Sequence, residues 1–236
     1  MFYKPLMAPA IGATLLLFTF LRFPDIIKKN YARYKEQTLE RVHIMTEVEL
    51  KAVLSPEQAV SLPGRLADLG FVPGDIVQEQ DLYYNAPHRD FRTTDEALRL
   101  RTITGSRNET VLTYKGPKRD SRSNTRLEHE TSVGDSRTVQ EILLSLGFCP
   151  VLTVCKDRRT YHLDAGTVCL DQVEGLGSYL ELEHLLPDES GREVAVDGLL
   201  SLLDRLGVQR QALERRSYLE LLLATTQAGG VSKREE

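Results

Sequence analysis

The stretch Glu47-Val48-Glu49-Leu50-Lys51 decides the fold class, because charged and apolar side chains alternate along it. In an extended strand, residues two apart share a face, so Glu47, Glu49 and Lys51 lie on one side and Val48 and Leu50 on the other. A half-exposed sheet would show the same alternation, with its charges in water. The interpretation of this strand therefore depends on what the other predicted strands carry.

Seven predicted strands carry charged side chains on one face and apolar ones on the other, which solvent exposure alone explains poorly. The charged sets are Glu47, Glu49 and Lys51; Arg99 and Arg101; Lys115; Arg126, Glu128 and Glu130; Lys156 and Arg158; Asp171; and Glu181 and Glu183. If the sheet closes on itself, this ionic face must line the interior, and the apolar face needs helices outside it.

The chain between residues 44 and 224 is predicted as a run of strands with a few inserted helices. The expected strands are 44–54, 75–84, 98–104, 110–116, 126–133, 151–163, 167–173 and 178–185. The expected helices are 56–69, 136–146, 192–206 and 213–224. Ser55-Pro56-Glu57 is a helix start, and Gly70 and Gly147 are helix stops. Consecutive strands with short turns predict an α+β fold with an antiparallel sheet or barrel and helices packed outside.

The composition excludes several classes of protein. With 236 residues, 41% hydrophobic and 27% charged, the chain is globular rather than fibrous or multi-pass membrane. Cys149, Cys155 and Cys169 are too few and too irregularly spaced for a disulfide framework or a zinc ribbon, and they fit a reducing compartment. The net charge is -4, yet residues 1–45 carry a local excess of positive charge. The remainder is therefore acidic, which disfavours nucleic acid as a partner.

An apolar run at residues 7–23 is followed by Lys28, Lys29, Arg33 and Lys35. Its length of about 17 residues is close to the minimum for a helix that crosses a membrane. The positive charges that follow it predict that the next domain is cytoplasmic. The alternatives are an over-extended start, with translation beginning at Met45, and a soluble N-terminal helix.

The expected domain organisation is an extension over 1–44, a folded domain over 45–223 and a flexible tail over 224–236. The expected location is the cytoplasm, with membrane tethering only if residues 7–23 are a true anchor.

An interior lined by about seven cations and seven carboxylates is costly unless the charges are paired, hydrated or occupied by a ligand. A triphosphate satisfies such a site, because the cations bind its phosphate oxygens. The carboxylates hold divalent metal ions, Mg²⁺ or Mn²⁺, which bridge the phosphates. The pattern therefore predicts a metal-dependent site for a small triphosphate.

The motifs, taken together and in order, resemble the CYTH, or triphosphate tunnel metalloenzyme, superfamily. EVELK at 47–51 is similar to the ExExK signature of that superfamily. The later motifs are LRLR at 98–101, TYKGP at 113–117, RLEHE at 126–130, KDRRTY at 156–161, CLDQVEGLGSYLELE at 169–183 and RRSYLELL at 215–222. The stretch 80–101 most resembles class IV adenylate cyclases. The resemblance covers about 45–222 and implies an eight-stranded antiparallel tunnel with amphipathic helices outside.

The resemblance also implies roles for individual residues. The implied metal ligands are Glu47, Glu49, Glu181 and Glu183, with Asp171 as a ligand or as a group behind one. The implied phosphate-binding residues are Lys51, Arg99, Arg101, Lys115, Arg126, Lys156 and Arg158. Catalysis is expected to depend on Glu49, Lys51, Arg101 and Lys156. Glu128 and Glu130 either orient cations or help to hold a second metal ion.

Three functions stay open at this point. The first is a class IV adenylate cyclase that converts ATP to cyclic AMP and pyrophosphate. The second is a triphosphatase acting on tripolyphosphate or thiamine triphosphate. The third is a non-catalytic module that binds polyphosphate or nucleotides, although a full set of acids is more than binding alone requires. The sequence also leaves a homodimer open.

Overall fold

The computed structural model describes residues 46–164, 166–186 and 189–230. The extension predicted over residues 1–44, with its apolar run at 7–23, lies outside these residues. Within the described ranges, no helix has the length and apolar character that a membrane crossing requires.

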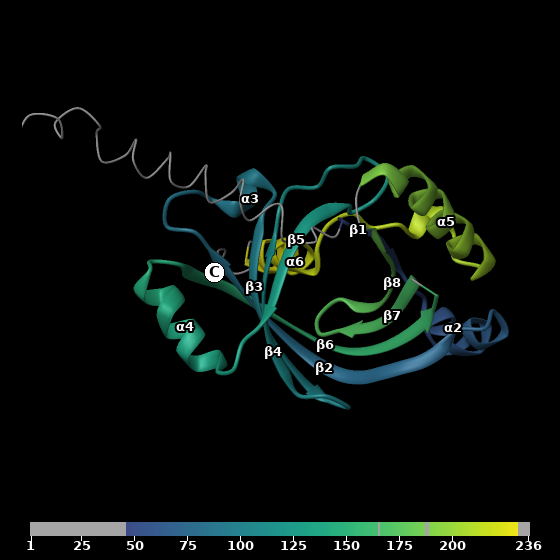
Figure 1. The fold of residues 1–236 in the computed structure, drawn as a ribbon, viewed down its shortest axis with the longest axis horizontal. Helices are drawn as coiled ribbons and strands as arrows, with labels where there is room; N and C mark the ends of the chain where they lie inside the picture. Colours follow the sequence, from purple (N-terminus) through teal and green to yellow (C-terminus); the bar gives the residue numbers. More distant parts are fainter. Residues whose placement is uncertain (1–45, 165, 187–188, 231–236) are drawn as a thin grey trace, which may run out of the picture. The chain divides into compact units, whose positions relative to one another are not determined.

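Eight strands form one closed antiparallel barrel (Figure 1), which confirms the predicted fold class. The strands are β1 (Thr46–Val53), β2 (Val72–Asn85), β3 (Ala97–Gly105), β4 (Glu109–Lys115), β5 (Arg126–Ser132), β6 (Cys149–Leu163), β7 (Gly166–Val173) and β8 (Gly177–Leu186). Their order around the barrel is β1-β5-β4-β3-β2-β6-β7-β8, and β8 pairs with β1 to close it. Closure sends alternate side chains of every strand into one interior.

The helices begin and end at local signals in the sequence. They are α2 (Pro56–Asp68), α3 (Phe91–Thr94), α4 (Ser136–Ser145), α5 (Arg192–Arg205) and α6 (Tyr218–Gly230), with short 3₁₀ turns η1 (Glu189–Gly191) and η2 (Arg210–Ala212). Ser55 accepts a hydrogen bond from the Gln58 amide, and the Gln58 side chain accepts one from the Ser55 amide, so α2 starts with a full capping box. Gly70 and Gly147 adopt the left-handed conformation that ends α2 and α4, as predicted.

The outward face of β1 and β8 packs under α2 and α5. This core includes Val48, Leu50, Leu180 and Leu182 from the strands and Leu62, Leu66, Leu199 and Leu203 from the helices. Burying each such side chain contributes about 1.5–3 kcal/mol, so the apolar half of the alternation anchors these helices outside the barrel.

A second outer layer forms where α4 lies against β3, on the side of the barrel away from α2 and α5 (Figure 1). Leu143 of α4 packs there with Tyr84 and Leu100, which point outward from β2 and β3. The apolar faces on both sides of the barrel are therefore covered, and the charged faces point inward.

The last helix differs from the prediction, because α6 begins at Tyr218 rather than at 213. Leu213 and Glu214 instead run beside β1, where the Glu214 amide donates to the Lys51 carbonyl at 2.8 Å. Ser217 then caps the helix by accepting from the Glu220 amide at 3.2 Å, and its own amide donates to the Glu220 carboxylate at 2.6 Å.

The position of α6 also differs from that of the other helices. Its residues Tyr218 and Leu221 cluster with Val154, Val173 and Tyr179, which lie on the inward faces of β6, β7 and β8. This helix therefore packs against the barrel interior at one end, where it helps to line the cavity.

Candidate functional site

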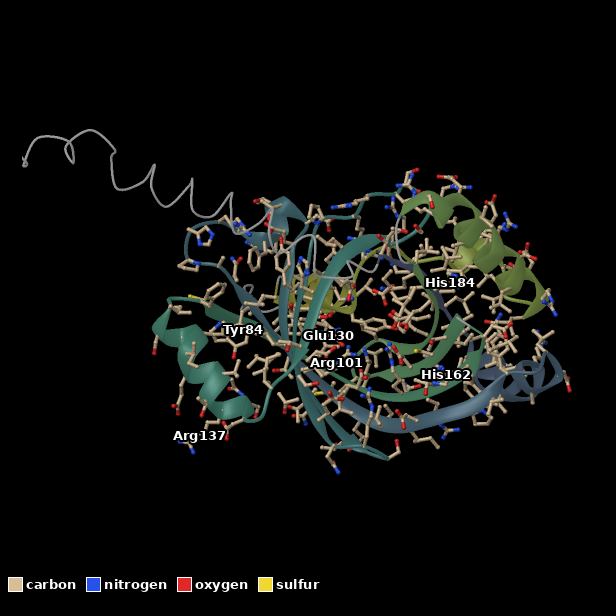
Figure 2. All side chains as sticks on the ribbon, in the orientation of Figure 1. Tyr84, Arg101, Glu130, Arg137, His162 and His184 are labelled. Carbon is tan, nitrogen blue, oxygen red and sulfur yellow. The ribbon has the colours of Figure 1, made fainter. Side chains whose placement is uncertain are left out.

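The barrel encloses a cavity of about 530 Å³ with side chains from all eight strands in its wall. Figure 2 places Arg101 within the barrel, whereas Arg137 of α4 points away from it. Of the predicted site residues, these line the cavity: Glu47, Glu49, Lys51, Arg99, Arg101, Lys115, Arg126, Glu128, Glu130, Lys156, Arg158, Glu181 and Glu183. Asp171 is buried but does not line it.

One side of the cavity, here called the cation side, carries Arg99, Arg101, Lys156 and Arg158. Two acids on β2 that the sequence analysis did not select lie among these cations. Asp81 is opposite Arg101 in the strand pairing, and the Arg101 guanidinium donates to its two carboxylate oxygens at 2.6 and 2.8 Å. Glu79 lies opposite Lys156, and its Oε2 is 3.1 Å from the Lys156 ammonium and 3.0 Å from Arg101 Nη1. Both acids are almost fully buried, so they hold these cations in place.

The neighbouring cations keep both acids ionised. Burial alone would raise the pKa of Glu79, but Lys156, Arg158 and Arg101 lower it to about 2. Burial likewise opposes ionisation of Asp81, and Arg101, Arg99 and Lys156 reverse this, so its pKa lies well below its ordinary value. The cation side is therefore a preformed ionic network at neutral pH.

Sequence reasoning missed these two acids because β2 does not alternate between charged and apolar residues. Gln78 and Gln80 occupy its outward face, so the usual hydrophobic contrast is absent. The available signal was the spacing of Glu79 and Asp81, two apart and flanked by Val77 and Tyr83.

Asp171 acts behind the cavity wall. The Arg158 guanidinium donates two hydrogen bonds to it, at 2.7 and 2.6 Å, and a third to Glu181. The Tyr218 hydroxyl donates to Asp171 Oδ2 at 3.0 Å. With its oxygens engaged in this way, Asp171 orients Arg158.

Tyr218 is a further residue that sequence reasoning did not select. Its ring lies under two cavity lysines, with the ring centroid 4.7 Å from Lys51 Nζ and 5.2 Å from Lys156 Nζ. It packs edge-to-face with Tyr179 at a centroid distance of 5.0 Å. Its place in the RRSYLELL motif was a signal, but the reach of its ring into the barrel depends on where α6 docks.

Carboxylates outnumber cations on the opposite side of the cavity. Glu49 lies directly across from Glu183 in the pairing of β1 with β8, and Glu47 lies two residues before Glu49. Burial and the neighbouring carboxylates raise the pKa of Glu183 to about 8. Burial also raises the pKa of Glu47 to about 7, with a further contribution from Glu128 and only partial compensation by Lys115. The nearby cations, Lys51, Lys115 and Arg158, lie 3.6–3.8 Å from these carboxylates and do not offset their burial and mutual repulsion at Glu47 and Glu183.

The side of the cavity that carries Glu47, Glu49 and Glu183, here called the acid side, fits a hard divalent cation, because carboxylate oxygens are the ligands that such a cation prefers. No three His, Cys, Asp or Glu side chains in the described ranges converge closely enough to hold a metal ion by themselves. Mg²⁺ is usually bound through one or two carboxylates together with waters and substrate phosphates, so this arrangement suits it.

Some cations keep donors that no carboxylate saturates. Arg126 is buried and forms no ion pair within the described ranges. Arg99 has a buried Nε without a hydrogen-bond partner in the described residues, although its other nitrogens contact Asp81 at 3.6 Å and Glu130 at 3.8 Å. In the part of the chain that is described, Lys51 has ion pairs only at 3.8 Å to Glu49 and 4.0 Å to Glu181, whereas Lys115 is hydrogen-bonded to Glu128. Arg126, Arg99 and Lys51 therefore have the most unused donor capacity for an anion in the cavity.

A closed antiparallel barrel with a cation network facing a carboxylate cluster across one cavity defines a charge-lined tunnel protein. The profile of the CYTH domain matches residues 45–218, and the chain belongs to the CYTH family.

Two curated proteins and one solved structure are among its relatives. The chain is 37% identical over 177 residues to "Putative adenylate cyclase MJ0240" of Methanocaldococcus jannaschii, covering 75% of this chain and 98% of that one. It is 31% identical over 144 residues to "Adenylate cyclase CyaB" of Aeromonas hydrophila, covering 61% of this chain and 72% of that one. The structure of the PH1819 protein from Pyrococcus horikoshii OT3 superimposes with a TM-score of 0.70 at 42% identity, covering 76% of this chain and 99% of that one.

Proposed function

We propose that this protein is a metal-dependent enzyme that processes small triphosphates, as a class IV adenylate cyclase converting ATP to cyclic AMP and pyrophosphate with Mg²⁺ or Mn²⁺. One observation supports the proposal above all: the cation network and the carboxylate cluster both line the same cavity within the barrel. The names of the two curated relatives support cyclase chemistry.

Apolar side chains in the same cavity support a nucleotide over an inorganic chain of phosphates. Tyr83, Phe91, Leu219 and Leu223 line it along with the ionic residues. A base-bearing triphosphate can place its aromatic ring against such a surface, whereas tripolyphosphate has no apolar part to bury.

The cations of the cavity bind and orient the phosphates in this proposal. Arg99, Arg126 and Lys51 contribute donors with spare capacity. Arg101 and Arg158 are fixed in orientation by Asp81 and Asp171, in two-point contacts. Because these groups are already oriented, little reorganisation is needed as charge develops in the transition state.

Glu47, Glu49, Glu181 and Glu183 would hold the metal ion, which would supply additional neutralisation of phosphate charge. In the cyclase reaction a bond forms between the ribose 3′ oxygen and the α-phosphorus. The bond from that phosphorus to the bridging oxygen breaks, and the hydroxyl proton leaves to solvent. Lys51, Lys156 and the arginines then offset the charge that accumulates on the departing pyrophosphate.

The test is to incubate the full chain with Mg²⁺ or Mn²⁺ and ATP, and to resolve the products by ³¹P NMR and anion-exchange chromatography. Cyclic AMP and pyrophosphate in equal amounts are expected. Glu49→Gln should abolish turnover, because it removes a carboxylate from the acid side. Glu141→Gln makes the same chemical change on the exposed face of α4 and should leave turnover unchanged.

Parallel reactions with tripolyphosphate and thiamine triphosphate separate the alternatives. If these substrates yield orthophosphate and ATP yields no cyclic AMP, the protein is a triphosphatase rather than a cyclase. If the protein binds ATP, tripolyphosphate and thiamine triphosphate but turns over none of them, it is a non-catalytic binding module.

A further inference from the structure

The segment between β4 and β5, residues 116–125, is held by its own hydrogen bonds and contacts β1 at Asn124. The Asn124 amide donates to the Glu49 carbonyl at 2.9 Å, and the Arg119 amide donates to the Thr125 carbonyl at 2.8 Å. The Ser123 and Thr125 hydroxyls lie 2.6 Å apart, and both residues are buried. This segment therefore has a defined position beside the middle of β1.

A second attachment comes from the residues that precede α6. The Arg215 guanidinium donates to the Asp120 carbonyl at 2.6 Å, with a longer contact to the Ser123 carbonyl at 3.4 Å. The side chain of Asp120 accepts from the Ser123 amide at 2.8 Å. Because the segment is held from both sides, one of its side chains is presented to the cavity in a fixed position.

That side chain is Asn124, which lines the cavity and is 5% exposed. Its Nδ2 donates to Glu49 Oε1 at 3.1 Å. Its Oδ1 is buried and has no hydrogen-bond partner among the described residues. A buried amide oxygen in a folded protein almost always has a partner, so an unpartnered one in a cavity wall indicates a ligand.

The chemistry of the surroundings specifies which ligand. The Glu49 carboxylate accepts from Asn124 Nδ2 and so lies directly beside this amide, which disfavours an anion there. An amide oxygen is a hard, neutral donor that Mg²⁺ and Ca²⁺ accept readily. Because no three carboxylates of the described residues converge, a cation held here by one or two of them has coordination positions left, and the Asn124 oxygen can fill one of these or bind a water that does.

We propose that Asn124 completes the divalent-cation site of this tunnel. Its Nδ2 fixes the rotamer of Glu49, and its Oδ1 faces the cation or one of its bound waters. This inference rests on the metal dependence in the proposed function, and it adds a ligand at a position that lies between the motifs at 113–117 and 126–130.

The test measures Mn²⁺ binding to the full chain without nucleotide, from the electron paramagnetic resonance signal of free Mn²⁺. Asn124→Leu, which has nearly the same size but no oxygen, is expected to weaken binding by about tenfold or more. Asn124→Asp keeps an oxygen at this position and adds charge, so its affinity should equal or exceed that of the wild type. Ser121→Ala, on the same segment but exposed and outside the cavity lining, should bind Mn²⁺ like the wild type.

Wild-type affinity in Asn124→Leu would overturn the inference. A loss in Asn124→Asp as large as that in Asn124→Leu would also overturn it, because Oδ1 would then have no part in binding. Circular dichroism establishes that each variant is folded, and Asn124→Ala replaces the leucine variant if that one is not. A wild-type protein that binds no Mn²⁺ would instead refute the metal dependence itself, before any variant is compared.

Discussion

The hydroxyl of Tyr218 donates a hydrogen bond to Asp171 Oδ2 at 3.0 Å, and this contact joins α6 to the cation side of the barrel. Asp171 in turn orients Arg158 through two hydrogen bonds. The same tyrosine ring lies against the ammonium groups of Lys51 and Lys156. A single side chain from the last helix thus positions three cations of the cavity.

Substitutions of Tyr218 should separate its hydroxyl from its ring. Tyr218→Phe removes one hydrogen bond and should lower the free energy of unfolding by about 1 kcal/mol, with only a small loss of turnover. Tyr218→Leu also removes both cation–π contacts, each of about 0.5–2 kcal/mol, and should lower the affinity for a triphosphate further. Urea unfolding and calorimetric titration with tripolyphosphate measure the two effects. Equal affinities in the two variants would show that the ring does not position the lysines.

Loss of Asp81 should destabilise the fold more than loss of any exposed acid. Asp81→Asn leaves Arg101 buried without its two-point partner, and breaking a buried pair in this way costs about 3–5 kcal/mol. Guanidinium unfolding of the variant, compared with that of Glu141→Gln on the surface of α4, measures the difference. A cost below about 1 kcal/mol would mean that Asp81 is not essential to the network.

Arg126 should contribute to ligand binding more than to stability, because it forms no ion pair in the described part of the chain. Arg126→Met should weaken tripolyphosphate binding by about tenfold or more, since a charge-assisted hydrogen bond contributes about 1.5–3 kcal/mol. Its melting temperature should stay close to that of the wild type. Arg137→Met, on the outside of α4, is the matched control and should change neither quantity. Unchanged affinity in Arg126→Met would remove this residue from the phosphate site.

The acid side predicts a pH-dependent stability for the metal-free protein. The pKa of Glu47 is raised from 4.5 to about 7 and that of Glu183 from 4.5 to about 8. Between pH 4.5 and about 8 the folded protein therefore retains protons that the unfolded chain has lost. Its stability should fall as the pH rises through this window, because the folded state binds more protons. Glu79 and Asp81 titrate below this range and do not contribute to the trend.

Thermal melts between pH 5 and 8.5, with and without Mg²⁺, measure this dependence. Mg²⁺ should raise the melting temperature more at pH 8 than at pH 5.5, because at the lower pH it must displace protons from the same carboxylates. Glu183→Gln should flatten the pH dependence and reduce the response to Mg²⁺. A metal-free protein that is most stable at pH 8.5 would contradict the assignment of these two carboxylates.

The inward and outward faces of the strands followed from the period of the sequence, whereas the closed eight-stranded barrel was implied by the family resemblance of the motifs. Alternation along EVELK and its counterparts determines which side chains share a face, because consecutive residues of a strand point in opposite directions. The same rule holds before any tertiary contact is known. For this reason Glu47, Arg101, Lys156 and Glu183 could each be assigned to the charged face of its strand from the residues alone, and closure of the barrel brings these faces into one interior.

The arrangement within that interior depended on tertiary structure. Which cation meets which acid is set by strand order and register, so the pairing of Arg101 with Asp81 required β2 and β3 to be neighbours. Asn124 and Tyr218 come from a loop and a helix, where no strand period applies. They reach the cavity only because the segment before β5 contacts β1 and α6 packs into one end of the barrel. Periodicity records the direction of a side chain within its own element, whereas contacts between elements arise only when the chain closes on itself.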